Sequence, residues 1–321
     1  MDEVWLSLMI GNSRLHWAVL LRDHVLETWD SRHIGRTAEG PFDIGATSNQ
    51  IADEVTVEGE GIPLSFLSKS ARELLQGDSS RVTREPTSGV GEPARSTATA
   101  GEDETSACLH LEPNRFRVAS VVPKELELWR RRCIGIMPIT SHDVIAGTEK
   151  YATLGVDRAL AVRGAARVGG WPVMVVDCGS ALTFTAGDKE GKLGGGAILP
   201  GVRLQLAALG TRTAQLPSNV TLPEQLPPRW AMSTQGGIQA GVMWTIVAGI
   251  RSFIEDRWRL ESEATVVFTG GDGKASAWVL HKAVVDSWEV EGSTPERMRD
   301  RIQYVAEVIH LGIASLAFGP V

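Results

Sequence analysis

The chain has 321 residues, of which 43% are hydrophobic, and this length and composition predict a globular protein of two domains with enough apolar residues to build their cores. Its net charge of −7 opposes a general affinity for polyanions, so we expect no nucleic-acid partner. Three scattered cysteines are too few for a disulfide framework or a zinc site and favour a cytoplasmic protein, and without a basic leader or a run of roughly 20 apolar residues we expect no membrane association.

The first third of the chain predicts strands, one helix and an insert. Residues 4–29 alternate as two or three strands in a meander, and residues 63–76 have the apolar spacing of a short amphipathic helix. Residues 77–106 are rich in Gly, Ser, Thr, Pro, Glu and Arg and contain almost no large apolar side chain. Such a segment cannot bury enough surface to offset its ordering entropy, so we predict a disordered insert there.

The rest of the chain predicts strands followed by helices, twice over. Residues 115–123 form a strand that ends at a proline able to open a helix through residue 133. The expected elements of the second half are a helix at 159–168, strands at 173–186 and 194–199, helices at 201–210 and 235–258, a strand at 265–269 and terminal helices from Lys274 and Pro295. We therefore predict an N-terminal domain over 1–150 and a C-terminal domain over 151–321.

The segment over residues 173–185, followed by the glycine-rich residues 194–201, carries the clearest chemistry. An apolar strand ends at Asp177, turns through Gly179 and Ser180, and re-enters a threonine-rich strand. A glycine turn lets backbone N–H groups approach an anion, and the carboxylate can hold a hard cation that neutralises phosphate charge. These features predict nucleotide chemistry.

A weaker copy of this hairpin lies near the N-terminus. Residues 8–18 also form strand, glycine turn and strand, and aligning Gly11 with Gly179 places Met9 opposite Asp177 and Asn12 opposite Ser180. Two hairpins of one design predict a duplicated domain.

Asp157 lies at the start of a predicted helix, within the run Gly155-Val156-Asp157-Arg158. An Asp at this place often only caps the helix or balances its dipole, and we give that role and a catalytic role about equal weight. Tyr151 and Arg158 favour catalysis, because the arginine could grip a carboxylate while Asp157 takes a hydroxyl proton during phosphoryl transfer.

Two further features are weak by themselves. Gly270 and Gly271 follow an apolar strand, which is ordinary for a strand-to-helix connection but would also let the backbone lie against an adenosine. His16 is expected to be a strand side chain, and its place beside the glycine turn keeps a phosphate contact open. The ten tryptophans are scattered, so we expect them to pack in the core and between helices.

Taken in order, a set of short motifs resembles the type III pantothenate kinase family over nearly the whole chain except about residues 35–110. These motifs are Gly11-Asn12-Ser13, the run 119–123, Tyr151 with the run 155–158, the run 177–181, the run 195–201, Thr213 with residues 214–217, and Thr269-Gly270-Gly271.

The resemblance implies a layered α/β fold of duplicated ribonuclease H-like, actin-like ATPase domains with an interdomain cleft, usually as a homodimer. It implies ATP-dependent phosphorylation of pantothenate to 4'-phosphopantothenate, the first step of coenzyme A biosynthesis, with Mg²⁺ and a monovalent cation, K⁺ or NH4⁺. Asp157 would be the general base, and Asp177 would hold the monovalent cation. Pantothenate would be bound by Tyr151, Gly155, Val156, Asp157, Arg158 and Thr213. ATP would be bound by Met9, Ile10, Gly11, Asn12, Ser13, Arg14, Leu15, His16, Ser180, Gly270 and Gly271.

Two residues depart from the pattern of that family, which has an Asp at the position of Met9 and a Lys at the position of His16. A thioether cannot replace a carboxylate in organising Mg²⁺, because hard cations prefer oxygen ligands. A neutral imidazole is also a poorer phosphate partner than an ammonium group. These departures leave two alternatives to the pantothenate kinase: a catalytically weak or inactive relative that binds ligand and regulates a partner, and a kinase for another small hydroxylated substrate.

Overall fold

The computed structural model divides the chain into two compact units, one built from described residues between 4 and 139 and the other from those between 140 and 318. It describes residues 4–34, 61–76, 108–111, 115–133, 135–136, 138–212, 216–217, 219–270, 274–291 and 300–318. The predicted insert at 77–106 lies outside these residues.

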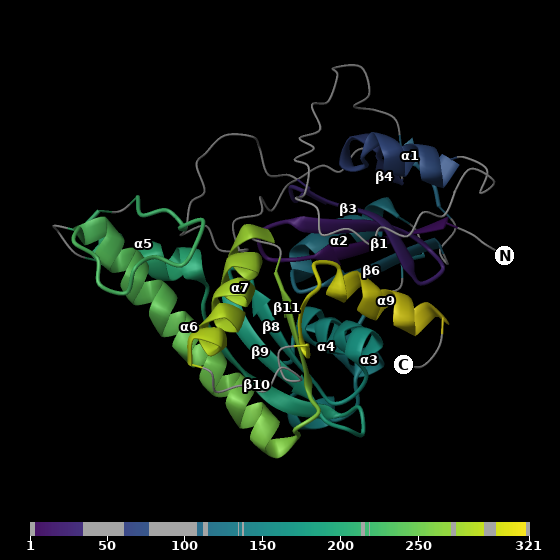
Figure 1. The fold of residues 1–321 in the computed structure, drawn as a ribbon. Helices are drawn as coiled ribbons and strands as arrows, with labels where there is room; N and C mark the ends of the chain where they lie inside the picture. The colour runs from purple at the N-terminus through teal and green to yellow at the C-terminus, as the bar shows by residue number, and fades with distance from the viewer. Residues whose placement is uncertain are drawn as a thin grey trace. The chain divides into compact units, whose positions relative to one another are not determined.

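The first unit is built on a five-stranded sheet in the order β3-β2-β1-β6-β7 (Figure 1). Its first three strands form an antiparallel meander, and the last two run parallel to β1. The strands are β1 (Val4–Ile10), β2 (Leu15–Leu21), β3 (His24–Ser31), β6 (Phe116–Ser120) and β7 (Pro138–Ile139). The meander predicted from residues 4–29 is confirmed.

The apolar face of the first sheet packs against helices α1 (Lys69–Gln76) and α2 (Pro123–Arg132). Pro123 opens α2 as predicted, since proline at the first helical position forfeits an N–H that would be unpaired anyway. Trp17 and Trp129 are fully buried in this core and pack edge to face. A short 3-10 turn η2 (Leu64–Phe66) and the paired strands β4 (Ile62–Pro63) and β5 (Cys108–Leu109) complete the described residues of the unit.

The second unit repeats this sheet in the order β10-β9-β8-β11-β12, with the same strand directions. The strands are β8 (Val173–Cys178), β9 (Ala181–Gly187), β10 (Leu193–Pro200), β11 (Thr265–Thr269) and β12 (Ile302–Tyr304). Identical strand order and direction in two sheets confirms the duplicated, ribonuclease H-like α/β fold.

Helices cover both faces of the second sheet (Figure 1). Helices α4 (Val156–Gly169) and α9 (Val308–Phe318) lie together on one face, and α6 (Thr234–Leu260) and α7 (Lys274–Glu291) pack on the other. The shorter elements are α3 (Ser141–Val144), η5 (Thr148–Lys150) and α5 (Val202–Arg212).

The start of the terminal helix predicted from Pro295 is not among the residues that the structure describes. Residues 302–304 form the edge strand β12, and the last helix begins at Val308. The strand exists because its backbone pairs with β11, for example Val267 opposite Gln303. A strand of three residues is too short to show an alternating pattern in the sequence, and the strand that it pairs with is distant along the chain.

Helix α6 is long and apolar enough, by length and composition, to cross a membrane, and 39% of its apolar window is buried within the fold. Its inward side chains, among them Met243, Ile250 and Ile254, belong to the core of the second unit. One side of this apolar helix therefore belongs to the core of the second unit.

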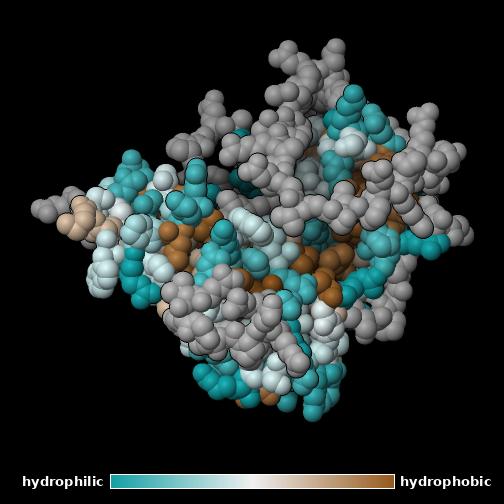
Figure 2. Space-filling view, viewed as in Figure 1, coloured by the Kyte–Doolittle hydropathy of each residue, from teal (hydrophilic) through white to brown (hydrophobic). Residues whose placement is uncertain are grey.

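Several large apolar side chains of the second unit remain at the surface, and Figure 2 shows apolar patches (brown) among hydrophilic surface (teal). Trp230 is 88% exposed and Trp278 is 44% exposed. The expectation that the tryptophans fill cores therefore holds for Trp17, Trp129, Trp258 and Trp288 and fails for these two.

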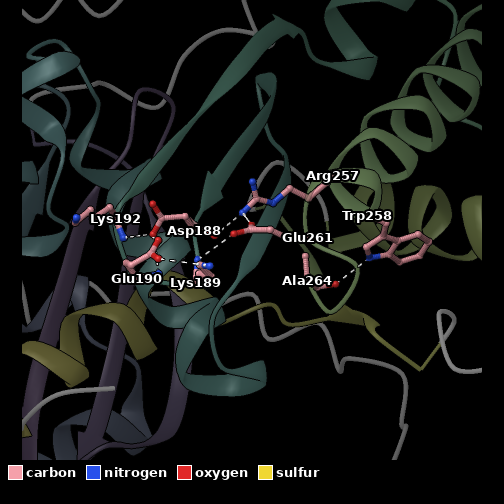
Figure 3. Close-up of polar contacts among 9 residues, drawn as sticks. Asp188, Lys189, Glu190, Lys192, Arg257, Trp258, Glu261 and Ala264 are labelled. Carbon is pink, nitrogen blue, oxygen red and sulfur yellow. Dashed lines mark hydrogen bonds and ion pairs between the residues drawn. The ribbon is translucent and has the colours of Figure 1, made fainter.

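A polar cluster ties the turn between β9 and β10 to the end of α6 (Figure 3). Arg257 forms an ion pair with Glu261 and donates to the Gly187 carbonyl over 2.7 Å, and Glu261 accepts the Lys189 amide over 3.1 Å. The Asp188 carboxylate accepts the Glu190 and Lys192 amides within the turn. These contacts fix the hairpin from which β10 runs toward the candidate site.

Candidate functional site

Asp157 lies in the first turn of α4, with its Oδ1 accepting the Arg158 amide over 2.8 Å. The residue that precedes the helix is Gly155, whose backbone is extended and which has no capping side chain. Asp157 is therefore not the cap of α4. Burial raises the pKa of its carboxyl, and the hydrogen bond from the Arg158 amide partly opposes that rise.

Arg158 is only 6% exposed, and each nitrogen of its guanidinium has a partner. Nε donates to Thr185 Oγ1 over 2.9 Å, Nη1 to the Tyr151 hydroxyl over 3.0 Å and Nη2 to the Phe184 carbonyl over 3.2 Å. The structure thus brings together Tyr151 and Arg158, as the sequence predicted. An arginine has five N–H donors, so two remain beyond these three bonds.

Gly196 on strand β10 leaves the space that this guanidinium occupies. A Cβ at Gly196 would lie 2.6 Å from Arg158 Nη2 and 2.0 Å from the Phe184 carbonyl oxygen. Thr185 and Gly196 were not recognised from sequence as parts of the site. The only signal was the glycine run at 194–196, because a glycine inside a strand often marks close approach of another group.

Asp177 lies near the end of β8, half-buried, opposite Thr183 on β9 and Thr269 on β11. Directly opposed residues project from the same face of a sheet, so two hydroxyls flank this carboxylate. The turn that follows is tightly packed: a Cβ at Gly270, whose φ is +145°, would lie 2.5 Å from the Cys178 carbonyl oxygen, and one at Gly201 would lie 2.2 Å from that of Gly179. The Gly201 amide also donates to the Ser180 carbonyl over 3.0 Å.

Asp157 and Asp177 belong to the same face of the second sheet. Val176 and Cys178 point into the core under α6, so Asp177 between them points to the α4 face. Thr185, which binds Arg158, lies opposite Val175 on that same face. Val175 is two residues before Asp177 along β8, a separation of about 7 Å.

The predicted phosphate turn of the first unit has a different character. Met9 is 1% exposed and lies opposite His16, which in turn lies opposite Asp30. His16 Nδ1 donates to Asp30 Oδ1 over 2.7 Å, and the Gly11 amide donates to the Arg14 carbonyl over 3.0 Å. Asp30 was not recognised from sequence, although a confident hairpin register would have placed it beside His16.

A polar groove of about 730 Å³ lies next to Tyr151 within the second unit. Its lining includes His142, Lys150, Asp188 and Lys192. Thr213 and Gly271, predicted to bind pantothenate and ATP, lie outside the described residues. Within the described part of the chain no three His, Cys, Asp or Glu side chains gather as a metal site.

Comparison with known proteins identifies the family. The family model described as type III pantothenate kinase matches residues 78–256. A type III pantothenate kinase from Nostoc sp. is 36% identical over 273 residues, covering 84% of this chain and 83% of that protein. The chain belongs to the type III pantothenate kinase family.

Other relatives agree with this assignment. A type III pantothenate kinase from Synechocystis sp. is 32% identical, over 87% of this chain and 80% of its own length. One from Synechococcus sp. strain JA-2-3B'a(2-13) is 49% identical over 162 residues, which cover 47% of this chain and 63% of that protein. The protein is therefore a kinase, and the ATP-dependent phosphorylation of pantothenate toward coenzyme A is the activity of its family.

Proposed function

We propose that the protein transfers the γ-phosphoryl group of ATP to the primary hydroxyl of pantothenate, giving 4'-phosphopantothenate, with Asp157 as the general base. The observation that carries this proposal is the half-buried Asp157 carboxylate at the start of α4, next to an arginine that is itself fixed by three hydrogen bonds. A raised pKa makes Asp157 a stronger proton acceptor than an exposed carboxylate.

The acceptor pocket that we propose consists of Tyr151, Gly155, Val156, Asp157 and Arg158, together with Thr213. Arg158 holds the Tyr151 hydroxyl in place, and its two remaining N–H donors can meet the anionic end of a substrate. The groove beside Tyr151 offers room for a small polar molecule.

Asp177 is proposed to hold the monovalent cation, K⁺ or NH4⁺. The neighbouring donors are oxygens of Thr183 and Thr269, which suit a hard cation and bring no further negative charge. Such a cation would neutralise phosphate charge near the Ser180 turn. ATP is proposed to contact residues 9–16, Ser180, Gly270 and Gly271. Since Met9 is buried and has no oxygen, Mg²⁺ would be held by the phosphates, water and other residues.

We extend the proposal to a cytoplasmic homodimer. Exposed apolar residues near and on α5 and α6, including Leu204, Trp230 and Met232, support an interface with a second copy.

The test is a kinase assay with mass detection of phosphopantothenate, using purified protein, ATP, pantothenate, Mg²⁺ and K⁺ or NH4⁺. Asp256→Asn is the matched control for Asp157→Asn. Asp256 is exposed on α6, where it forms an ion pair with Arg259. Absence of product from the native protein at every Mg²⁺ concentration would contradict the proposal.

The buried Met9 supports one alternative, a ligand-binding relative without turnover. Calorimetry decides between this alternative and the kinase. If ATP or pantothenate binds but no phosphopantothenate is formed, the result supports the ligand-binding relative. Competition by pantothenate analogues would reveal a kinase for another hydroxylated substrate.

A further inference from the structure

The guanidinium of Arg158 is a buried charge that is held by neutral groups. The side chain extends from α4, which packs against the second sheet, and it is 6% exposed. Its acceptors among the described residues are the Thr185 hydroxyl, the Phe184 carbonyl and the Tyr151 hydroxyl, over 2.9, 3.2 and 3.0 Å. An arginine keeps its proton, so these bonds satisfy three of its donors and leave its positive charge without a negative partner.

The adjacent carboxylate, that of Asp157, does not neutralise this charge by direct contact. Its Oδ1 accepts the Arg158 backbone amide over 2.8 Å. Burial raises the pKa of Asp157, and the Arg158 charge is one of the smaller effects that oppose the rise, so the two side chains are close enough for each to feel the other. Among the described residues, no acidic side chain forms an ion pair with the guanidinium. A buried charge in this state favours an anionic ligand.

Two donors of Arg158 remain for such a ligand among the described contacts. Nη1 and Nη2 carry two N–H groups each, and each nitrogen uses one of them, for Tyr151 and Phe184 respectively. The remaining N–H groups therefore belong to neighbouring nitrogens, which is the arrangement that binds both oxygens of a carboxylate. Gly196 has no side chain to obstruct Nη2, since a Cβ there would lie 2.6 Å from it.

Thr185 sets the orientation of this guanidinium. It lies in β9, is 2% exposed, and accepts from Nε. Its β-branched side chain has a restricted χ1, so the strand holds the hydroxyl in one place. The preceding residue, Phe184, accepts from Nη2 with its carbonyl, so two consecutive residues of β9 hold one side of the guanidinium and leave Nη1 for Tyr151. Because the threonine hydroxyl has no charge, it orients the arginine without neutralising it.

We propose that Thr185 is the positioning residue of Arg158 and thereby determines the preference of this kinase for an acceptor with an anionic end. The proposal deepens the proposed function and rests on it for the identity of the acceptor. Pantothenate carries its carboxylate at the end opposite the primary hydroxyl that is phosphorylated. Loss of the Thr185 hydroxyl should therefore weaken binding of the carboxylate and leave the chemistry at the hydroxyl in place.

The experiment compares pantothenate with pantothenyl alcohol, in which CH2OH replaces the carboxylate. Calorimetry measures the Kd of each, and the kinase assay measures KM and kcat with pantothenate. Thr185→Val should weaken pantothenate binding about tenfold and change the Kd of the alcohol less than about twofold, since only the acid uses the oriented charge. The KM for pantothenate should rise with kcat little changed, because a contact remote from the reacting hydroxyl is the same in the ground state and the transition state.

Two further variants isolate the hydroxyl. Thr185→Ser keeps it and should retain nearly the native preference for the acid over the alcohol. Thr185→Cys has a similar size but a weakly accepting sulfur, so it should lose part of that preference, and it tests the proposal if the valine variant does not fold. Circular dichroism checks the fold of each variant. A serine variant that loses as much preference as the cysteine variant would overturn the proposal.

Thr265→Val is the matched control. Thr265 is another buried threonine of the same sheet, 6% exposed, and its Oγ1 donates to the Gly169 carbonyl over 3.3 Å. Gly169 is at the opposite end of α4 from Arg158. This variant should keep the native Kd for both ligands. An equal loss of preference in the two valine variants would attribute the effect to the fold and overturn the proposal.

The calorimetric readout separates this inference from the proposed function, because it needs no phosphoryl transfer. A preference for the acid that depends on Thr185 supports the inference even if no phosphopantothenate is formed. An active kinase whose preference survives in Thr185→Val retains the proposed function and refutes the inference. A native protein that binds neither ligand, or binds both equally, also refutes it.

Discussion

The two sheets hold equivalent rows of four residues with different chemistry. In the first unit the row across β3, β2, β1 and β6 is Asp30, His16, Met9 and Ala119; in the second unit the row across β10, β9, β8 and β11 is Ile198, Thr183, Asp177 and Thr269. The second row has its carboxylate on the central strand between two hydroxyls. The first has a buried thioether there, and its ionisable side chains, His16 and Asp30, lie on β2 and on the edge strand β3.

The turns that follow also differ. The first runs from Gly11 to Arg14, and the second, one residue shorter, from Gly179 to Ala181, with each glycine amide bonded to the last carbonyl of its turn. In the second unit Gly201 and Gly270 pack directly on the turn. The difference teaches that duplication preserved strand pairing while the side chains in matching positions diverged, so we expect the two units to tolerate substitution very differently.

The largest expected effect lies in the second unit, at Asp157. Asp157→Asn should lower kcat about a thousandfold, because general-base assistance is typically worth two to four orders of magnitude. The assay is phosphopantothenate formation, with circular dichroism to confirm folding and Asp256→Asn as control. Activity within tenfold of the native protein would remove Asp157 from the mechanism and weaken the contrast between the units.

The next effect tests the row itself. Asp177→Asn should lower kcat/KM about a hundredfold and abolish stimulation by K⁺ or NH4⁺, since a neutral amide holds a hard cation poorly. Ile198→Ala, at the 59%-exposed edge of the same row, should leave cation stimulation intact. Stimulation that survives in Asp177→Asn would place the cation elsewhere.

The packing contrast predicts unequal glycine substitutions. Gly270→Ala should cost about 2–3 kcal/mol of unfolding free energy, because its positive φ and the nearby Cys178 carbonyl both exclude a methyl group. Gly11→Ala should cost about 1 kcal/mol, since the nearest atom is the end of the His16 ring. Gly241→Ala on α6, where a Cβ meets nothing within 4 Å, should stabilise the protein by about 0.5–1 kcal/mol. Urea denaturation measures all three, and equal losses at 11 and 270 would remove the contrast.

The smallest expected effect is on the pH dependence of stability. The pKa of Asp157 is raised in the folded state, so the folded protein binds a proton more tightly than the unfolded chain. Stability therefore falls as the pH rises from the unfolded-state pKa through the folded-state pKa of this group. Asp157→Asn removes this loss and should have a Tm at neutral pH at least as high as the native protein, with the difference vanishing below about pH 4. The same group predicts that native kcat falls as the pH drops through its raised pKa. A lower Tm for the variant at neutral pH would contradict the burial argument.

Much of the fold was accessible from sequence because its signals are local. The strands at 4–29 and 173–199, the helix opened by Pro123 and the helix that carries Asp157 follow from apolar period, glycine turns and proline. The short strand β12 and the role of Asp30 were not accessible, because each depends on which strand lies alongside. Thr185 escaped notice for the same reason, being only one more threonine in a strand until Arg158 packs on it.

The sequence by itself determined the duplicated plan, the acids at 157 and 177 and the glycine turns, since each is encoded by neighbours along the chain. Only the tertiary structure decided that Tyr151, Arg158 and Thr185 meet, that Gly196 makes room for the guanidinium, and that His16 is bonded to Asp30 rather than free. Strand register and helix packing set those contacts, and both arise from surfaces that come together only when distant segments fold against one another.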